Sequence, residues 1–133
     1  MKGFIISYLT AVTCVFYWLY QDKALEESIQ RGGEIYADFC VTCHLEAGEG
    51  VEGTFPPLAK SDYLLNNRKE SIKGVKYGQR GPITVNGKLY DNTMMPLGLE
   101  DEEVADVMNY ILNSWGNSSD KMVTPEEVKN ILK

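Results

Sequence analysis

The feature that most constrains this chain is the stretch Cys40-Val41-Thr42-Cys43-His44. Two cysteines three residues apart, with a histidine directly after the second, form the attachment signature of c-type haem. On a helical turn the side chains of Cys40, Cys43 and His44 face one side, because residues three and four apart are neighbours on a helix. The two thiols can then bond to the vinyl groups of a planar macrocycle while the imidazole reaches the iron.

A zinc site is the alternative interpretation of a cysteine and histidine motif. Structural zinc sites use four Cys or His ligands, usually arranged as two pairs. This chain has three cysteines and one histidine, so a second pair does not exist. The motif therefore predicts one covalently attached haem c.

The charge of the chain limits the partners it can bind. All nineteen acidic residues lie after Tyr20, together with twelve of the thirteen basic ones, so that part carries a net charge of −7. Nucleic-acid binding needs basic patches and is not expected. An acidic surface suits a redox partner protein with a positive surface, because charge complementarity speeds encounter. The alternative is that the acidity only keeps the protein soluble.

The first twenty residues hold one charge, Lys2, followed by an apolar run that starts at Phe4. Such a run is near the short end of a bilayer-spanning helix, which needs roughly 17 to 25 residues. It is either a cleaved signal peptide or a retained anchor, and a small-residue cleavage site is missing. Aromatic residues at its end are typical of a membrane interface: Tyr17, Trp18 and Tyr20. We expect a membrane anchor or signal peptide at 1–20, a polar linker at 21–28 and one domain at 29–133.

Hydrophobic periodicity and capping residues predict an all-α domain of four to five helices with one small β-hairpin. The clearest helix covers 101–115, where apolar residues recur at helical spacing. Shorter helices are expected from about Ser28 to Phe39 and at 61–65, 67–77 and 124–132. Asn86-Gly87 between two short apolar stretches predicts a tight hairpin turn.

The single histidine also limits the second axial ligand of a haem iron. This chain cannot supply two histidines, so the sixth ligand is a methionine, another residue or none. A loop containing Met94-Met95-Pro96 follows the motif by about fifty residues and precedes the last long helix. Methionine ligation raises the reduction potential and favours electron transfer over oxygen chemistry.

With these motifs in place, the chain resembles the class I cytochromes c. It is most similar to the small domains that serve as electron-donor subunits of, or are fused to, enzymes such as copper nitrite reductases and quinoprotein dehydrogenases. The resemblance runs from about Gly32 to Asn117 and implies a cytochrome c fold around one haem. It is carried by these stretches: Cys40-Val41-Thr42-Cys43-His44, Gly48-Glu49-Gly50, Phe55-Pro56-Pro57-Leu58-Ala59, Ser61-Asp62-Tyr63-Leu64, Gly81-Pro82-Ile83-Thr84-Val85-Asn86-Gly87 and Asn113-Ser114-Trp115-Gly116-Asn117.

The resemblance also implies roles for residues outside the motif. The Pro56 carbonyl would accept a hydrogen bond from His44, and Leu58 would pack on the haem. Gly32 and Tyr36 would lie where the first helix crosses the helix that carries Tyr110.

Two departures from the family pattern concern the methionine loop. The family usually has two prolines after the ligand and a leucine-serine pair before the last helix, whereas this chain has Met95 and Glu100 at two of those positions. Counting from Tyr90 or from Asp101 assigns the ligand to Met94, and the local Met-Pro pair would assign it to Met95. We favour His44 and Met94 as the two metal ligands.

These features predict a one-electron carrier of a respiratory chain, with the haem domain anchored on the outer, periplasmic side of the cytoplasmic membrane. It would exchange electrons with respiratory redox partner proteins and would not be an enzyme. The alternatives are an electron-transfer subunit of a membrane-associated dehydrogenase or reductase, or a haem protein that binds a small ligand. A peroxidase would need an acid–base histidine beyond the one in the motif.

The anchor can be tested on protein from the native host. Because no small-residue cleavage site follows the apolar run, the mature chain should begin near Met1 and should pellet with membranes through a high-salt wash. A soluble product that begins between Gln21 and Leu25 would show that a signal peptide is removed.

Overall fold

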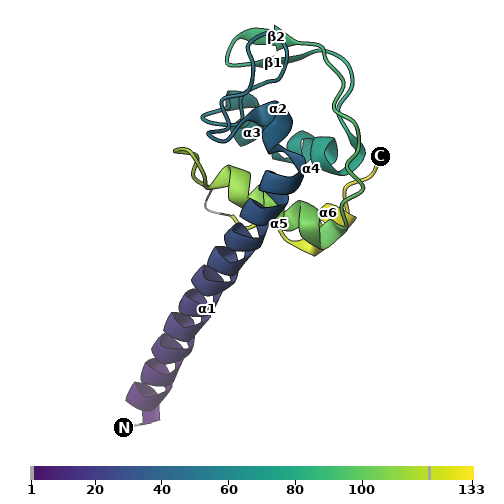
Figure 1. The fold of residues 1–133 in the computed structure, drawn as a ribbon. Helices are drawn as coiled ribbons and strands as arrows, with labels where there is room; N and C mark the ends of the chain where they lie inside the picture. Colours follow the sequence, from purple (N-terminus) through teal and green to yellow (C-terminus); the bar gives the residue numbers. More distant parts are fainter. Residues whose placement is uncertain (1, 120) are drawn as a thin grey trace.

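The computed structural model describes residues 2–119 and 121–133, and it describes side chains from Tyr20 onward except that of residue 120. Figure 1 shows that α1 extends away from the fold, while the other elements gather around its C-terminal part. The elements in chain order are α1 (Lys2–Phe39), α2 (Val41–His44), α3 (Asp62–Asn66), α4 (Arg68–Tyr77), β1 (Ile83–Val85), β2 (Lys88–Tyr90), α5 (Asp101–Leu112) and α6 (Pro125–Lys129).

The mainly helical architecture with one hairpin agrees with the sequence analysis, but the number of helices differs. The described part contains six helices where four to five were expected. The segment at 21–28, expected to be a linker, is part of α1, which runs through it without a break. Between Gly3 and Gly32 the sequence has neither glycine nor proline, the residues that most disfavour a helix. Lys23 and Glu27 also form an i,i+4 ion pair at 3.6 Å.

The expected membrane anchor falls almost entirely outside the residues whose side chains are described. Among the residues that are described, no helix is long and apolar enough to span a bilayer. Of the range 1–20, only the side chain of Tyr20 is described, and it is exposed.

The contact between α1 and α5 brings the two halves of the chain together. At Gly32 an added Cβ would lie 2.0 Å from the Asp106 carbonyl oxygen, so only glycine allows this approach. The Tyr36 ring packs against Tyr110 with centroids 5.3 Å apart, which confirms the expected crossing. Ser28, expected near a helix start, instead lies buried within α1.

A polar cluster completes this crossing. The Ser28 hydroxyl donates to Asp106 Oδ1 at 2.6 Å, and Asn109 donates to the Ser28 oxygen at 2.8 Å. The Arg31 guanidinium donates to both carboxylate oxygens of Asp106, at 2.6 and 2.8 Å. Arg31 thus neutralises a carboxylate that is 5% exposed, as a buried charge requires.

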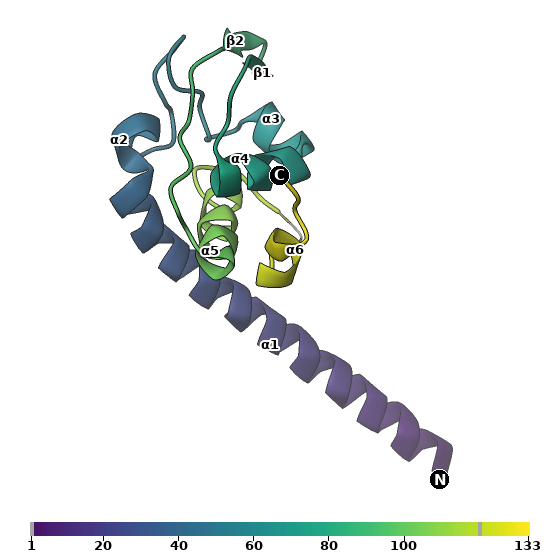
Figure 2. The same cartoon turned by 90° about the vertical axis from the view of Figure 1, so that its right-hand side faces the viewer.

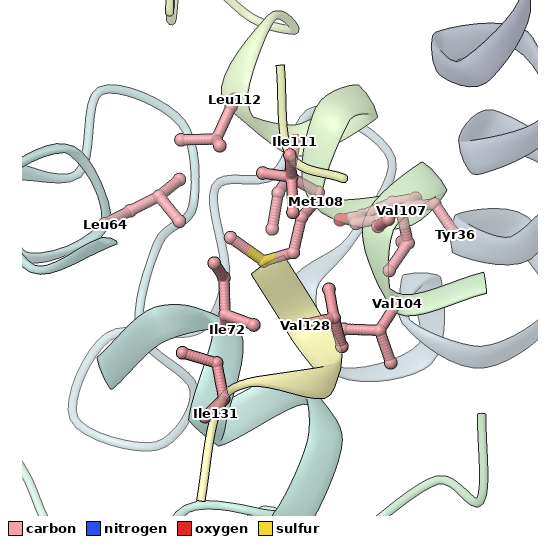
Figure 3. Packing of buried hydrophobic residues seen from close by; sticks show 12 residues of the cluster. Tyr36, Leu64, Ile72, Val104, Val107, Met108, Ile111, Leu112, Val128 and Ile131 are labelled. Carbon is pink, nitrogen blue, oxygen red and sulfur yellow. The ribbon is translucent and has the colours of Figure 1, made fainter. Parts of the chain in front are cut away.

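Helix α5 supplies the centre of the core. Its predicted apolar face is confirmed: Val104, Val107, Met108, Ile111 and Leu112 are each at most 4% exposed. Figure 3 shows them packed with Ile72 from α4 and Val128 from α6 in one cluster. The helix ends at Leu112 and not at Trp115, because Trp115 has φ 54° and its indole N–H donates to the Glu46 carbonyl.

The first turn of α5 explains one departure from the family pattern. The Glu100 side chain accepts a hydrogen bond from the backbone N–H of Glu103, and the Glu103 carboxylate accepts one from the Glu100 N–H at 2.8 Å. This is a reciprocal capping box, which satisfies two N–H groups that a helix start leaves free. Glu100 thus does the capping that a serine usually does.

The crossing predicts different outcomes for two adjacent glycines. In Gly32→Ala the new methyl group would overlap the α5 backbone, so we expect the free energy of unfolding to fall by about 1–3 kcal/mol, the usual cost of overpacking. In Gly33→Ala the methyl group would lie 3.2 Å from the Tyr110 ring, which can shift slightly. Alanine's higher helix propensity, about 1 kcal/mol, should offset that contact.

Denaturant unfolding of the haem-loaded protein measures both changes. Equal losses in the two variants would contradict the close backbone contact at Gly32.

Candidate haem site

A cavity of about 360 Å³ lies between α2, the loop after it, α3, α4, the hairpin, the methionine loop and α5. Figure 2 shows α2 on one side of these loops and α3 and α4 on the other. Most of its wall is apolar. All six residues that the sequence analysis assigned to a haem site line this one cavity: Cys40, Cys43, His44, Pro56, Leu58 and Met94.

The Cys-x-x-Cys-His stretch forms one helical turn, as expected. The backbone N–H groups of Cys43 and His44 both donate to the Cys40 carbonyl, at 3.2 and 2.9 Å. Burial, and then the neighbouring Cys43, raise the pKa of the Cys40 thiol to about 11. Both cysteines are free thiols on the cavity wall, so both are available to form thioether bonds.

The His44 imidazole is 9% exposed, and its Nδ1 lies 3.0 Å from the Pro56 carbonyl oxygen. A carbonyl can only accept, so Nδ1 carries the proton and Nε2 keeps its lone pair. Burial lowers the pKa of His44, and the bond to Pro56 opposes this in part. The result is a neutral, oriented imidazole, the form in which histidine binds a metal.

The loop that carries Pro56 is held by its own backbone. Gly48 accepts from the N–H groups of Leu58 and Ala59 at 2.7 and 2.9 Å, and Gly50 donates to His44 at 3.0 Å. Gly50 has φ 63°, and an added Cβ there would lie 2.4 Å from the Phe55 carbonyl oxygen. These contacts position the Pro56 carbonyl over the imidazole.

The two methionines of the loop differ in their surroundings. Met94 exchanges two backbone hydrogen bonds of 2.9 Å with Gln79, which lies just after α4. This antiparallel bridge holds the backbone of Met94 in an extended conformation. Met94 is half-buried, whereas Met95 is 59% exposed. Both residues line the cavity.

The hairpin contributes lining residues that the sequence analysis did not assign to the site. Ile83, Val85 and Tyr90 lie on the cavity wall, and the latter two are buried. Strand alternation could have indicated this, because Ile83 and Val85 occupy one face of β1 and Lys88 and Tyr90 one face of β2.

The donor set fits a covalently attached haem. Two thiols and a neutral imidazole project from one turn, and a thioether side chain lines the same cavity from another loop. The walls around them are apolar, as a planar macrocycle requires. The described residues contain no group of three or more His, Cys, Asp or Glu side chains that could hold a metal ion without a haem.

Comparison with known proteins agrees with this arrangement. The family model for cytochrome c matches residues 29–115. Cytochrome c-552 of Thermus thermophilus is 38% identical over 109 residues, which cover 75% of this chain and 82% of that protein.

Two longer relatives match over a similar part of this chain. The cytochrome c subunit of the quinone alcohol dehydrogenase of Gluconobacter oxydans is 30% identical over 104 residues, covering 75% of this chain and 21% of the relative. The cytochrome c subunit of gluconate 2-dehydrogenase of Pantoea cypripedii is 32% identical over 108 residues, covering 78% of this chain and 24% of the relative.

The family match covers more than half of the chain, and it includes the Cys-x-x-Cys-His turn that forms the wall of the cavity. The chain therefore belongs to the cytochrome c family, whose members carry covalently attached haem c, and it is a class I c-type cytochrome.

Proposed function

We propose that this cytochrome is a one-electron carrier of a respiratory chain, with His44 and Met94 as the axial ligands of its haem iron. The observation that carries the proposal is the pairing of a buried, neutral imidazole with a half-buried methionine on one apolar cavity. Histidine and methionine together give a high reduction potential and leave no open position for substrate. Both features suit a carrier.

The remaining site residues would support these two ligands. Cys40 and Cys43 would form the thioether bonds, and the Pro56 carbonyl would hold the His44 ring in one orientation. Leu58 would pack on the macrocycle and keep water away from it. A dry site that keeps its ligands in both oxidation states changes little when one electron arrives or leaves.

Two observations favour Met94 over Met95 as the sulfur ligand: its backbone is held by Gln79, and it is less exposed. Adjacent residues in an extended segment point to opposite sides. Only one of the two can therefore approach the iron.

We further propose that the haem domain works outside the cytoplasm and is retained at the membrane by residues 1–20. The apolar run and the missing cleavage site support this. Redox partner proteins would then meet the haem domain at the membrane surface.

A second candidate is an electron-transfer subunit of a dehydrogenase. It is favoured by relatives that are cytochrome c subunits of alcohol and gluconate dehydrogenases. Co-purification from detergent-solubilised membranes of the native host separates the two. A stoichiometric dehydrogenase complex would support the subunit, and a cytochrome that elutes alone would support the free carrier.

Loss of one motif thiol should loosen the haem. In Cys40→Ala or Cys43→Ala one thioether bond cannot form, so less haem should stay on the chain in a denaturing gel stained for haem. Full retention of haem in both single variants would contradict covalent attachment through this motif.

The two methionines provide a matched pair of variants for the axial ligand. Met94→Ala should abolish the sulfur–iron charge-transfer band of the oxidised protein, lower the reduction potential and allow carbon monoxide to bind the reduced protein. Met95→Ala should keep the band, with a loss of stability on the order of a kcal/mol or two.

The absorption spectrum of each oxidised variant shows which of the two methionines is the ligand. A band that persists in Met94→Ala and disappears in Met95→Ala would assign the ligand to Met95. A band that persists in both variants would show that neither methionine of this loop is the sixth ligand.

A further inference from the structure

The methionine loop is held at its two ends and not along its length. At one end, Met94 exchanges two backbone hydrogen bonds with Gln79, just after α4. At the other end, the loop leads into α5, which begins at Asp101. Between these ends, residues 95–99 form no backbone hydrogen bond within the described part of the chain. The place of Met94 therefore depends on what fixes the two ends.

One lysine connects these two ends. Lys76 lies in the last turn of α4, three residues before Gln79, and its Nζ lies 2.8 Å from Asp101 Oδ1. Asp101 is the first residue of α5, so the ion pair ties the end of α4 to the point where the methionine loop ends. The Lys76 side chain is only 14% exposed, so salt and water screen this pair less than a surface pair.

The same ammonium group also reaches the C-terminal helix. Lys76 Nζ donates to the Val128 carbonyl of α6 at 2.9 Å, and the neighbouring Tyr77 hydroxyl donates to the Ile131 carbonyl at 3.0 Å. A lysine can bond the carbonyls of the last turn of a helix in this way. Figures 1 and 2 both show the chain end after α6 beside α4. One side chain thus joins three helices next to the methionine loop.

The methionine loop touches the end of α4 so closely that the two must move together. Gly78 has φ 81°, and an added Cβ there would lie 2.6 Å from the Met94 carbonyl oxygen and 2.9 Å from the Pro96 nitrogen. The backbone pairing of Gln79 with Met94 follows directly. A displacement of the last turn of α4 would therefore carry Met94 away from its place on the cavity wall.

The other cations near the start and middle of α4 lack this connection. Lys69 and Lys73 form no ion pair within the described residues. Arg68 donates to both carboxylate oxygens of Glu127, at 2.7 and 2.8 Å, but it lies in the first turn of α4, at the far end of the helix from Gln79. Arg68 therefore attaches the C-terminal segment without fixing the methionine loop.

We propose that Lys76 is a positioning residue for the methionine ligand: it holds the end of α4 against Asp101 and α6, and thereby keeps Met94 on the cavity wall. The inference rests on the proposed function in one respect, that Met94 is the sulfur ligand. Helix α6 lies beyond residues 29–115, which the family model matches, so the contact with Val128 is not part of the matched domain.

The test compares full-length, haem-loaded Lys76→Met with wild type. Imidazole can bind the oxidised iron only when the methionine has left it, so its apparent affinity measures the fraction of molecules in which Met94 is displaced. We expect this affinity to rise by about tenfold, because a hydrogen bond to a charged group is lost. Lys73→Met removes the same charge one turn earlier and should keep the wild-type affinity. Lys76→Arg retains a charged donor and should stay close to wild type.

Amide hydrogen exchange separates positioning from general stability. The Met94 N–H donates to the Gln79 carbonyl, so it should exchange faster in Lys76→Met, while the amide of the buried Met108 in α5 keeps its wild-type rate. Equal acceleration at both amides would show that Lys76 only stabilises the fold, and would overturn its positioning role. An imidazole affinity unchanged from wild type would overturn it as well.

Asp101→Ala removes the ion pair from its other side and tests the same contact where Lys76→Met does not fold. Its imidazole affinity should also rise, whereas Glu102→Ala, which removes the next acidic residue of the same helical turn, should leave the affinity unchanged. Wild-type affinity in Asp101→Ala would contradict a role for the ion pair. A sulfur–iron band that persists in Met94→Ala contradicts the proposed ligand, whereas a band lost there, with wild-type behaviour of Lys76→Met, contradicts only the role of Lys76.

Discussion

The contact between α1 and α5 is the constraint on which the rest of this structure depends. Helix α1 leads directly into the Cys-x-x-Cys-His turn, and α5 provides the apolar wall on the other side of the cavity. The distance between these two parts of the site is therefore set where the helices touch. Gly32 allows the backbones to meet there, and Arg31 and Ser28 keep the buried Asp106 carboxylate satisfied.

The second element of the site is a loop with little regular structure that is nevertheless held in place. Positive-φ glycines and backbone hydrogen bonds fold the segment after α2 so that the Pro56 carbonyl meets His44 Nδ1. This leaves Nε2 as the ring nitrogen that could bind a metal. On the other face, the backbone pairing of Met94 with Gln79 attaches the methionine loop to the end of α4. Both candidate ligands are thus positioned by main-chain contacts.

The sequence predicts the elements with strong local signals. The periodic apolar face of α5, the Asn86-Gly87 turn and a short helix at about 61–65 all appear as expected, because each depends on residues close together in the chain. The helical structure of the segment at 21–28, which we expected to be a polar linker, could not be predicted in the same way. A polar composition at 21–28 resembles a linker, but polar residues without glycine or proline also form a helix, and contacts of Ser28 with Asp106 favour it.

The sequence by itself determined the chemistry: one Cys-x-x-Cys-His motif, one histidine and two candidate methionines define a covalently bound haem and its possible ligands. Covalent and coordinate bonding depends on residue type and short spacing, which a sequence displays directly. The tertiary structure alone decided which distant groups meet. The burial of Met94 relative to Met95, the acceptor for His44 and the place of Tyr90 on the cavity wall all arise from packing between segments far apart in the chain.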